Sequence, residues 1–391
     1  MYIMGEEEVQ AVRRVIESGR LFRYRGGEGG ETDNFEREWS EKIGVAYTIA
    51  MTSGTAALIC GLVGLGIGPG DEVIVPGYTF MATALAPLAV GAVPIIAEVD
   101  ESLTLDPEDF ERRVTPRTRV VIPVHMCGWP CDMDAILDIA QRHGLAVLED
   151  TCQADGGSYK GRRLGSIGDA GAFSFNQFKI IACGEGGTLV TDNRDIFEKA
   201  LIHHDTGCVY REHASGIETP IFAGSNFRMN EILGAILRVQ LTRLDGILAA
   251  LRKEKRTMMS ELEGESAFTF NPIHDVEGDC ATTLALLFDS AAEARAFLEH
   301  LKADGIAADS PIDSGRHVYA NWEPILEQRG AHHPGRDAYR LAAGPVAYSR
   351  DMCPRTLSNL ERTVCIPASP TRSEQELADL IRCVKKAAAL P

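Results

Sequence analysis

The sequence predicts an α/β protein whose large domain is built on a mostly parallel sheet covered by helices. Between residues 46 and 194, short apolar segments alternate with segments of helical spacing. The apolar segments are rich in β-branched residues and show little polar alternation, which is typical of strands buried on both faces. Strands that alternate with helices form parallel sheets, because each helix carries the chain back to the start of the next strand.

The N-terminal segment precedes this alternation. A helix is expected over residues 5–19, because Val9, Val12, Val15 and Ile16 can share one face. A loop rich in glycine and arginine follows over residues 19–34, and then a short helix that ends at a glycine, over residues 35–44. Seven strands are expected next, at residues 46–51, 72–77, 93–100, 119–126, 145–150, 172–176 and 187–192, with helices at 54–66, 81–90, 107–113 and 132–143.

The second half of the chain predicts a smaller α+β domain. Residues 230–263 have the spacing of one or two long helices, which would connect the two domains. The division is placed between a large domain, residues 1–245, and a small one, residues 246–391. The small domain is expected to hold a strand at 282–289 and helices at 290–305 and 373–390.

Composition excludes several classes of partner. The chain of 391 residues has 39 basic and 56 acidic side chains, a formal net charge of −17, which argues against nucleic acid or an anionic membrane as its main partner. No apolar segment approaches the roughly 20 residues of a membrane span, and no signal peptide is evident, so a cytoplasmic location is expected. The ten cysteines are scattered, and the pair in CGWPC lacks a second pair at metal-ligand spacing, so no metal site is expected.

Polar and small residues follow several predicted strands at their carboxyl ends, where ligands bind in parallel sheets. The first strand is followed by Ser53, Gly54 and Thr55, which open a helix. Free backbone amides and hydroxyls at such a position can hold a phosphate, although a plain helix cap explains the same residues. The second strand is followed by Tyr78 and Phe80, either of which could cover a flat ring or pack in the core.

A carboxylate and an amine follow two later strands. Asp150 ends one buried strand, where it could cap the next segment or meet a buried cation. Lys179 follows another strand, in the nearly uncharged stretch SFNQFKIIACGEGG. A desolvated lysine is a nucleophilic amine that can form a Schiff base, whereas an ordinary lysine would reach solvent or pair with Glu185. An anion cradle, an aromatic ring, a carboxylate and an amine together are the groups that pyridoxal phosphate requires.

The chain also resembles a known family over nearly its whole length, most densely in residues 1–240. The matching segments include TSGTAAL, GPGDEVIVPGYTFMATA, HGLAVLEDTCQADGG, GSIGDAGAFSFNQFKIIACGEGGTLVTD and SNFRMNEILGAI. These are similar to the DegT/DnrJ/EryC1/StrS aminotransferases, which act on sugars and aminocyclitols. The resemblance implies the fold type I architecture of pyridoxal phosphate enzymes, and an amino group moved from glutamate or glutamine to a keto-cyclitol or keto-sugar.

The resemblance also implies a role for individual residues. Lys179 would bond to the cofactor and then carry protons, and Asp150 would keep the pyridine nitrogen protonated. Phe80 would stack on the ring and Gln153 would lie by its 3′-oxygen. The phosphate would be bound by Ser53, Gly54 and Thr55, with help from Ser174.

Further implications concern the assembly and the substrate. Asn226 would reach the phosphate of a neighbouring subunit's cofactor, so a homodimer with shared sites is expected. The segments that depart from the family pattern line the substrate entrance in that family. The residues in these segments that are candidates to contact the substrate are Arg23, Arg25, His317 and Tyr319. One alternative hypothesis is a dehydratase or decarboxylase that uses the same cofactor, and another is a non-catalytic binding protein. The presence of Lys179 favours transamination over both.

Overall fold

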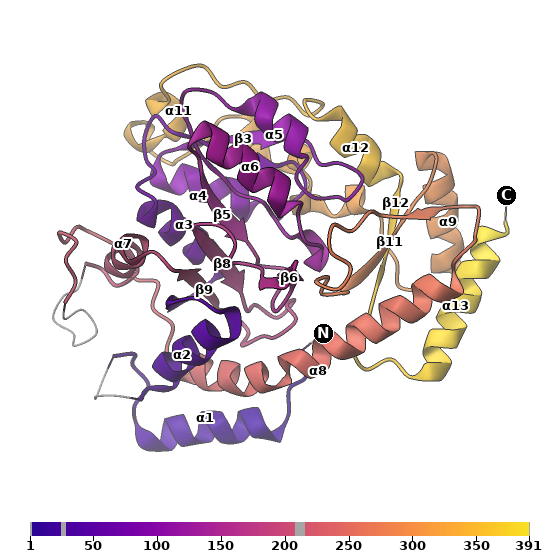
Figure 1. Ribbon diagram of the computed structural model, residues 1–391, viewed down its shortest axis with the longest axis horizontal. Helices are drawn as coiled ribbons and strands as arrows, with labels where there is room; N and C mark the ends of the chain where they lie inside the picture. Colours follow the sequence, from indigo (N-terminus) through magenta and orange to yellow (C-terminus); the bar gives the residue numbers. More distant parts are fainter. Residues whose placement is uncertain (1, 25–28, 208–215, 391) are drawn as a thin grey trace.

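The computed structural model describes residues 2–24, 29–207 and 216–390, and its centre is a seven-stranded sheet (Figure 1). The strand order is β1-β9-β8-β5-β4-β2-β3. Every neighbouring pair from β8 to β3 is parallel, and β9 is antiparallel to both β8 and β1. This confirms the predicted mostly parallel sheet. Its strands are β1 (Tyr47–Met51), β2 (Glu72–Pro76), β3 (Val93–Ala97), β4 (Thr118–Val121), β5 (Ala146–Asp150), β8 (Ala170–Ser174) and β9 (Gly187–Thr191).

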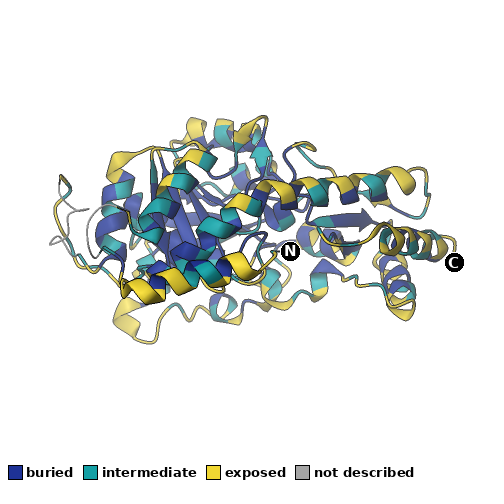
Figure 2. Cartoon of the chain, turned by 90° about the horizontal axis from the view of Figure 1, so that it is seen from below, coloured by how far each residue is buried: buried dark blue, intermediate teal, exposed yellow. Residues whose placement is uncertain are grey.

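Helices cover both faces of this sheet. Consecutive side chains of a strand point to opposite faces, so they belong to two different hydrophobic cores. On β2, Val73 and Val75 join the core formed with α3 (Gly54–Gly64), α4 (Ala82–Val90) and α7 (Arg194–His204). Ile74 joins the core on the other face, formed with α2 (Glu31–Ile43), α6 (Met133–His143) and α8 (Glu231–Glu261). Figure 2 shows the buried sheet enclosed by helices whose outer faces are exposed. The helices between the strands are α3 (Gly54–Gly64), α4 (Ala82–Val90), α5 (Pro107–Arg113) and α6 (Met133–His143), and α7 (Arg194–His204), which was not predicted, follows the last strand.

The two N-terminal helices differ from the sequence prediction. In α1 (Glu6–Ser18) the buried apolar residues are Ala11 and Val15, which pack against Ala235, while Val9 and Ile16 are exposed. The face of α1 that is buried is therefore determined by the contact with α8, and not by the number of apolar residues on that face. Helix α2 (Glu31–Ile43) begins inside the segment expected to be a loop, because acidic residues in its first turn favour the positive end of a helix.

A single long helix, α8 (Glu231–Glu261), connects the large sheet to a second, three-stranded sheet (Figure 1). The smaller sheet is antiparallel, in the order β10-β11-β12. The proposed domain division after residue 245 falls inside α8. The smaller sheet and its helices are β10 (Thr269–Phe270), β11 (Thr283–Leu287), β12 (Thr363–Pro367), α9 (Ala291–Ala303), α12 (Pro354–Glu361) and α13 (Glu374–Ala388).

The remaining elements are short. A two-stranded ribbon, β6 (Ser158–Tyr159) and β7 (Arg162–Arg163), lies between β5 and β8 in the chain, and α10 (Glu323–Leu326) and α11 (Ala338–Leu341) lie between α9 and α12. Within the described ranges, none of the helices combines the length and apolarity that crossing a membrane requires.

Candidate active site

Four of the segments that were predicted to carry chemistry meet at one edge of the large sheet. Strands β2, β5 and β8 are parallel, and β1 runs in the same direction because β9 is antiparallel to both β1 and β8. The carboxyl ends of these strands therefore face the same way. The segments that leave them contain Ser53, Phe80, Asp150 and Lys179.

Asp150 is buried at the end of β5, and both of its carboxylate oxygens accept hydrogen bonds. The hydroxyl of Thr83 donates to Oδ2 at 2.7 Å, and the backbone amide of Cys152 donates to Oδ1 at 3.1 Å. The second bond caps the next segment, as one of the two predicted readings required. Thr83 lies in the first turn of α4 and was not identified from the sequence, because a threonine near the start of a helix is an ordinary residue there.

The carboxamide of Gln153 has a defined orientation. Its Oε1 accepts a hydrogen bond from the backbone amide of Cys127 at 3.1 Å, which leaves the NH₂ group free to donate elsewhere. Cys127 has a left-handed backbone conformation, with φ of 51°, inside the turn Met126–Gly128. A non-glycine residue rarely adopts this conformation, so the turn that orients Gln153 is specifically maintained.

The turn between β1 and α3 is packed against two neighbouring segments. Ser53 caps α3, since its hydroxyl accepts the amide of Ala56 at 3.1 Å. A Cβ atom at Gly54 would lie 2.7 Å from the sulfur of Cys152 and 2.9 Å from Cβ of Ser174. The turn, the segment after β5 and the end of β8 are therefore adjacent. Thr55 is half-buried in the first turn of the same helix, at its positive end.

Lys179 is half-buried in the turn that follows β8. Its backbone amide donates to the carbonyl of Asn176 at 3.0 Å, and the preceding side chain, Phe178, is 72% exposed. Among the residues that the structure describes, no ion pair joins Lys179 to Glu185 or to another carboxylate. The charge of Lys179 opposes the rise that burial causes in the pKa of Cys152 and of Asp155, and it adds to the fall that burial causes in the pKa of His317.

Phe80 lies beside His317, with 5.5 Å between the ring centroids, and 42% of Phe80 is exposed. The two residues meet because their segments pair: the amide of Thr79 donates to the carbonyl of His317 at 2.9 Å. Burial lowers the pKa of His317, and the charge of Lys179 lowers it further. Tyr78, the other aromatic residue after β2, is buried in the core.

Two residues predicted to contact substrate are instead committed to the protein interior. Arg23 is 2% exposed, its guanidinium pairs with the carboxylate of Glu36, and it donates a hydrogen bond to the carbonyl of Ala50 at 2.9 Å. A buried charge is costly unless it is paired in this way. Tyr319 is fully buried, and its hydroxyl donates to the carbonyl of Arg350 at 2.9 Å and accepts the amide of Cys353. Arg25 lies outside the described residues.

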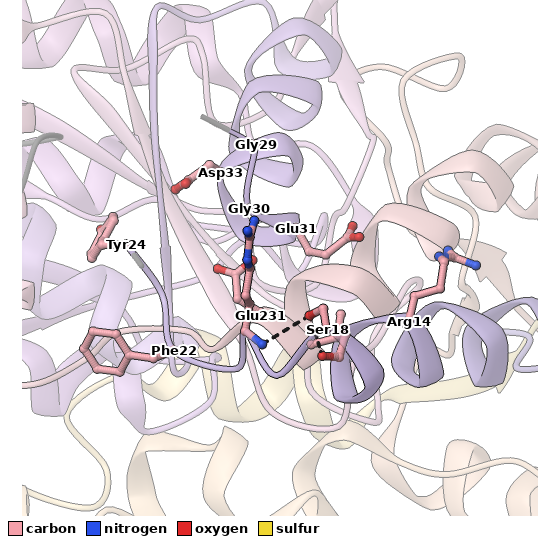
Figure 3. A pocket seen from close by; sticks show the side chains of 11 residues that line it. Arg14, Ser18, Phe22, Tyr24, Gly29, Gly30, Glu31, Asp33 and Glu231 are labelled. Carbon is pink, nitrogen blue, oxygen red and sulfur yellow. Dashed lines mark hydrogen bonds between the residues drawn. The ribbon is translucent and has the colours of Figure 1, made fainter. Parts of the chain in front are cut away.

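The segment around Arg23 borders a separate hollow of about 210 Å³ between α1, α2 and the start of α8 (Figure 3). Phe22 and Tyr24 line it together with Glu31 and Glu231. Lys179 is not among its lining residues. This part of the N-terminal segment therefore faces a different region from the edge of the sheet that carries Lys179 and Asp150.

Asn226 is exposed, and its side chain is held by the neighbouring backbone. Its Oδ1 accepts the amide of Arg228 at 3.3 Å, and Asp205 and Asn226 form an isolated antiparallel bridge. The side chain of Arg228 pairs with that of Asp205 at 2.6 Å. This segment presents Asn226 on the surface of the chain.

The arrangement suits a phosphorylated ring with an aldehyde. A Cβ atom at Gly54 or Gly187 would clash with neighbouring segments, so the Ser53 turn is closely packed. The turn leads into the N-terminus of α3, and backbone amides at such an N-terminus can bind an anion. Asp150 supplies a buried acceptor, Phe80 an exposed ring face and Lys179 an amine, all beyond the carboxyl ends of the strands. Across the described ranges, no group of three or more metal-ligating side chains is suited to hold a metal ion.

Comparison with known proteins gives the same picture. The model of the DegT/DnrJ/EryC1/StrS aminotransferase family matches residues 2–323. A spore coat polysaccharide biosynthesis protein, SpsC of Bacillus subtilis, is 35% identical over 402 aligned residues, covering 98% of this chain and 95% of that protein. An L-glutamine:2-deoxy-scyllo-inosose aminotransferase of Streptoalloteichus tenebrarius is 36% identical over 267 residues, covering 66% of this chain and 62% of that protein.

Solved structures share the fold over the whole chain. The crystal structure of DesV of S. venezuelae in complex with a ketimine intermediate superposes with a TM-score of 0.81 at 31% sequence identity, covering 99% of this chain and 95% of DesV.

Proposed function

Because this chain belongs to the DegT/DnrJ/EryC1/StrS aminotransferase family, we propose that it transfers an amino group from glutamate or glutamine to the ketone carbon of a cyclitol or a sugar. It is a pyridoxal phosphate-dependent aminotransferase with the fold type I architecture. The observation that carries the proposal is the placement of Lys179 after β8, beside the segment that leaves β5 with Asp150.

Each residue has a proposed task toward the cofactor, which supplies an electron sink for the carbon that loses a proton. Lys179 would provide the amine that holds it, and Nζ of Lys179 would then carry a proton. Asp150 would accept a hydrogen bond from the pyridine nitrogen and favour its protonated form. Its orientation is maintained by Thr83.

Other residues hold the ring and its phosphate. The start of α3, with Ser53, Gly54 and Thr55, would bind the phosphate through backbone amides and hydroxyls, and Ser174 is adjacent to Gly54. The exposed ring of Phe80 would cover one face of the cofactor. Gln153 would donate a hydrogen bond from its NH₂ group to the 3′-oxygen, since its Oε1 already accepts the amide of Cys127.

The substrate class rests on two observations. One relative carries the name of an aminotransferase that acts on 2-deoxy-scyllo-inosose with L-glutamine, and another that of a polysaccharide biosynthesis protein. His317 lies next to Phe80, where a substrate bound over the ring would meet it. We therefore assign the substrate contact to His317 and not to Arg23 or Tyr319, which are buried.

The assembly is proposed to be a homodimer with shared sites. Asn226 is exposed on its own chain, where it could complete the phosphate site of a second copy. The exposed apolar side chains Phe22 and Phe178 are of the kind that such a contact would cover. As separate parts of the proposal, the protein acts on small molecules and its location is the cytoplasm.

The test uses the absorbance of the purified protein with bound pyridoxal phosphate. L-Glutamate and L-glutamine are added separately, and the expected result is loss of the long-wavelength band of the lysine-bound cofactor and growth of the short-wavelength band of the aminated cofactor. Keto-cyclitols and keto-sugars are then screened for their ability to reverse the change. Lys179→Ala should lack the initial band, while Lys253→Ala, a distant surface variant, should behave as wild type.

Either of two outcomes would contradict the proposal. A protein that binds the cofactor but responds to neither donor, and still consumes a sugar-like substrate, would be a dehydratase or a decarboxylase. A Lys179→Ala variant with full activity would remove the assignment of the amine itself.

A further inference from the structure

The turn at Cys127 has a backbone conformation that residues other than glycine rarely adopt. Its φ of 51° lies in the left-handed region, and such a conformation persists in a cysteine only where the surrounding structure imposes it. The amide of Cys127 donates at 3.1 Å to Oε1 of Gln153, a residue proposed to bind the cofactor. Whatever holds this turn in place therefore also sets the orientation of Gln153.

The other backbone polar group of Cys127 is bound by a residue far along the chain. Its carbonyl accepts a hydrogen bond at 2.5 Å from the hydroxyl of Thr282, which is buried and directly precedes β11. The two residues are 155 positions apart. Cys127 thus carries two hydrogen bonds, with Gln153 at its amide and Thr282 at its carbonyl, and its backbone conformation fixes the angle between them.

A second contact fastens the same turn to the same distant segment. The amide of Cys280 donates to the carbonyl of Gly128 at 3.1 Å, and a Cβ atom at Gly128 would lie 2.6 Å from Cβ of Cys280. The two backbones therefore approach as closely as a glycine permits. The close packing prevents the turn from moving toward this segment, and the two hydrogen bonds resist its moving away.

The segment that supplies Thr282 is itself fixed by α8. Lys255 of that helix pairs with Asp279 at 2.5 Å, and both side chains are buried. The other carboxylate oxygen of Asp279 accepts the amide of Ala281 at 2.8 Å, and Ala281 is a second left-handed residue, with a φ of 59°. Separating a buried pair would leave an uncompensated charge, so this pair keeps its geometry. The hydroxyl of Thr282 is thus presented from a fixed segment.

We propose that Thr282 is a positioning residue for the cofactor site, and that it acts on Gln153 through the backbone of Cys127. A glutamine carboxamide can rotate by half a turn, which exchanges its acceptor oxygen and its donor NH₂ group. The amide of Cys127 selects one of the two orientations, because only Oε1 can accept its hydrogen bond. Thr282 keeps that amide directed at Gln153, so the NH₂ group remains the one available to the cofactor.

This inference rests on the proposed function, in which the NH₂ group of Gln153 donates to the 3′-oxygen of the cofactor. That oxygen is acidic, and a donated hydrogen bond favours its ionised form. Without the Thr282 hydroxyl, the turn is free to leave the left-handed region and the carboxamide is free to rotate. We therefore expect ionisation of the 3′-oxygen to move to higher pH, although the hydroxyl itself is bonded to a backbone carbonyl.

The competing explanation is that Thr282 only stabilises the start of β11. Thr363 provides the matched control, because it is buried in β12 and its hydroxyl donates to the carbonyl of Asn359 at 2.6 Å. Valine has nearly the shape of threonine, and at either position it removes one hydroxyl that is bonded to a backbone carbonyl. A purely structural effect should be similar in Thr282→Val and Thr363→Val, whereas an effect through Gln153 should appear only in Thr282→Val.

The first experiment varies the pH of the full-length protein with bound pyridoxal phosphate and follows the absorbance of the lysine-bound cofactor. In Thr282→Val the midpoint of the absorbance change should rise by about 0.5–1 pH unit, as for partial loss of a hydrogen bond to a charged group. Gln153→Met should raise the midpoint at least as much. Thr282→Ser, which keeps the hydroxyl, and Thr363→Val should leave it at the wild-type value. Lys179 and Asp150, the charged groups proposed to contact the cofactor, are present in every variant.

The second experiment uses the cofactor-free, full-length protein. Urea unfolding is measured for Thr282→Val, Gln153→Met and the double variant. Because both residues are bonded to Cys127, the double variant should lose less stability than the sum of the two single losses. The same cycle with Thr363→Val in place of Thr282→Val should be additive. If Thr282→Val does not fold, Thr282→Ala, which removes the same hydroxyl, replaces it in both experiments.

Three outcomes would overturn the inference. The first is additive losses of stability for Thr282 and Gln153. The second is an unchanged absorbance midpoint in Thr282→Val when Gln153→Met shifts it, and the third is an equal shift in Thr363→Val. If Gln153→Met itself leaves the absorbance midpoint unchanged, the cofactor contact proposed for Gln153 is wrong, and the unfolding cycle alone decides whether Thr282 positions that residue.

Discussion

The hydroxyl of Thr83 donates a 2.7 Å hydrogen bond to Oδ2 of Asp150, although the two residues are 67 positions apart in the chain. Thr83 belongs to the helix after β2 and Asp150 ends β5, so the bond links two of the segments that build the site. Thr83 is in turn bonded to Thr79 at 2.8 Å. The carboxylate proposed to hold the pyridine nitrogen is thus oriented from both sides, by a hydroxyl and by the amide of Cys152.

Replacing Thr83 by valine should lower kcat/KM without unfolding the protein. A hydrogen bond to a charged group contributes about 1.5–3 kcal/mol, and each 1.36 kcal/mol corresponds to a tenfold change in rate. We therefore expect a loss of about 10- to 100-fold. Thr83→Ser, which keeps the hydroxyl, should retain most of the activity, and equal activity of the valine and serine variants would show that the bond is dispensable.

Replacing Gly187 by alanine should weaken cofactor binding through the backbone. A Cβ atom at Gly187 would lie 2.4 Å from the carbonyl carbon of Ser53, so the turn proposed to bind phosphate would have to move. Overpacking of this kind destabilises a protein by about 1–3 kcal/mol. The dissociation constant of pyridoxal phosphate, measured by fluorescence titration, should increase in Gly187→Ala, and the free energy of unfolding should decrease.

The matched control is Gly246→Ala. A Cβ atom at this position in α8 would meet nothing within 4 Å, and the residue is exposed. Since alanine is favoured over glycine in helices by about 1 kcal/mol, the protein should become slightly more stable and bind the cofactor as before. If both variants bound the cofactor as the wild type does, Gly187 would not be needed to shape the phosphate site.

Removal of the Arg23 side chain should affect stability and not substrate affinity. Burial raises the pKa of Glu36, against the opposing effect of Arg23, so the carboxylate depends on its partner for its charge. Breaking a buried pair by removing one partner costs about 3–5 kcal/mol. Urea unfolding of Arg23→Ala should show this loss, while the KM for the keto substrate stays at the wild-type value in the folded protein.

A surface pair gives the comparison for Arg23. Lys42 and Asp245 form an ion pair at 2.6 Å in which Asp245 is 70% exposed. Lys42→Ala should change the free energy of unfolding by at most about 1 kcal/mol. An Arg23→Ala variant with normal stability and a raised KM for the keto substrate would contradict this prediction and show that Arg23 contacts the substrate.

Mixing two inactive variants should restore activity if the sites are shared between subunits. Lys179→Ala removes the amine of one chain, and Asn226→Ala removes the group proposed to reach the other chain's phosphate. A mixed dimer would then contain one intact site. Refolding the two variants together should recover part of the wild-type activity, whereas each alone stays inactive; no recovery would place all the groups of a site on one chain.

The sequence was sufficient for the fold and for the residues at the strand ends. Short β-branched segments between helical ones indicated the parallel sheet, and the carboxyl ends of parallel strands meet at one edge, so Asp150 and Lys179 could be brought together from their positions alone. The seven strands of the large sheet and the helices between them lie where they were expected, within a few residues.

The side-chain partners could not be predicted in the same way. Arg23 and Tyr319 lie in irregular segments without periodicity, so nothing in the sequence distinguished a buried residue from one facing the substrate. The burial of Val15 in place of Ile16 likewise depended on the position of α8. These choices are made by contacts between segments far apart in the chain.

What the sequence alone determined is the order of chemical groups along the sheet, because strand periodicity and chain direction are local properties. What only the tertiary structure decided is which of those groups are paired: Thr83 with Asp150, and Arg23 with Glu36. Pairing depends on distance and burial, and both arise only when the helices pack on the sheet.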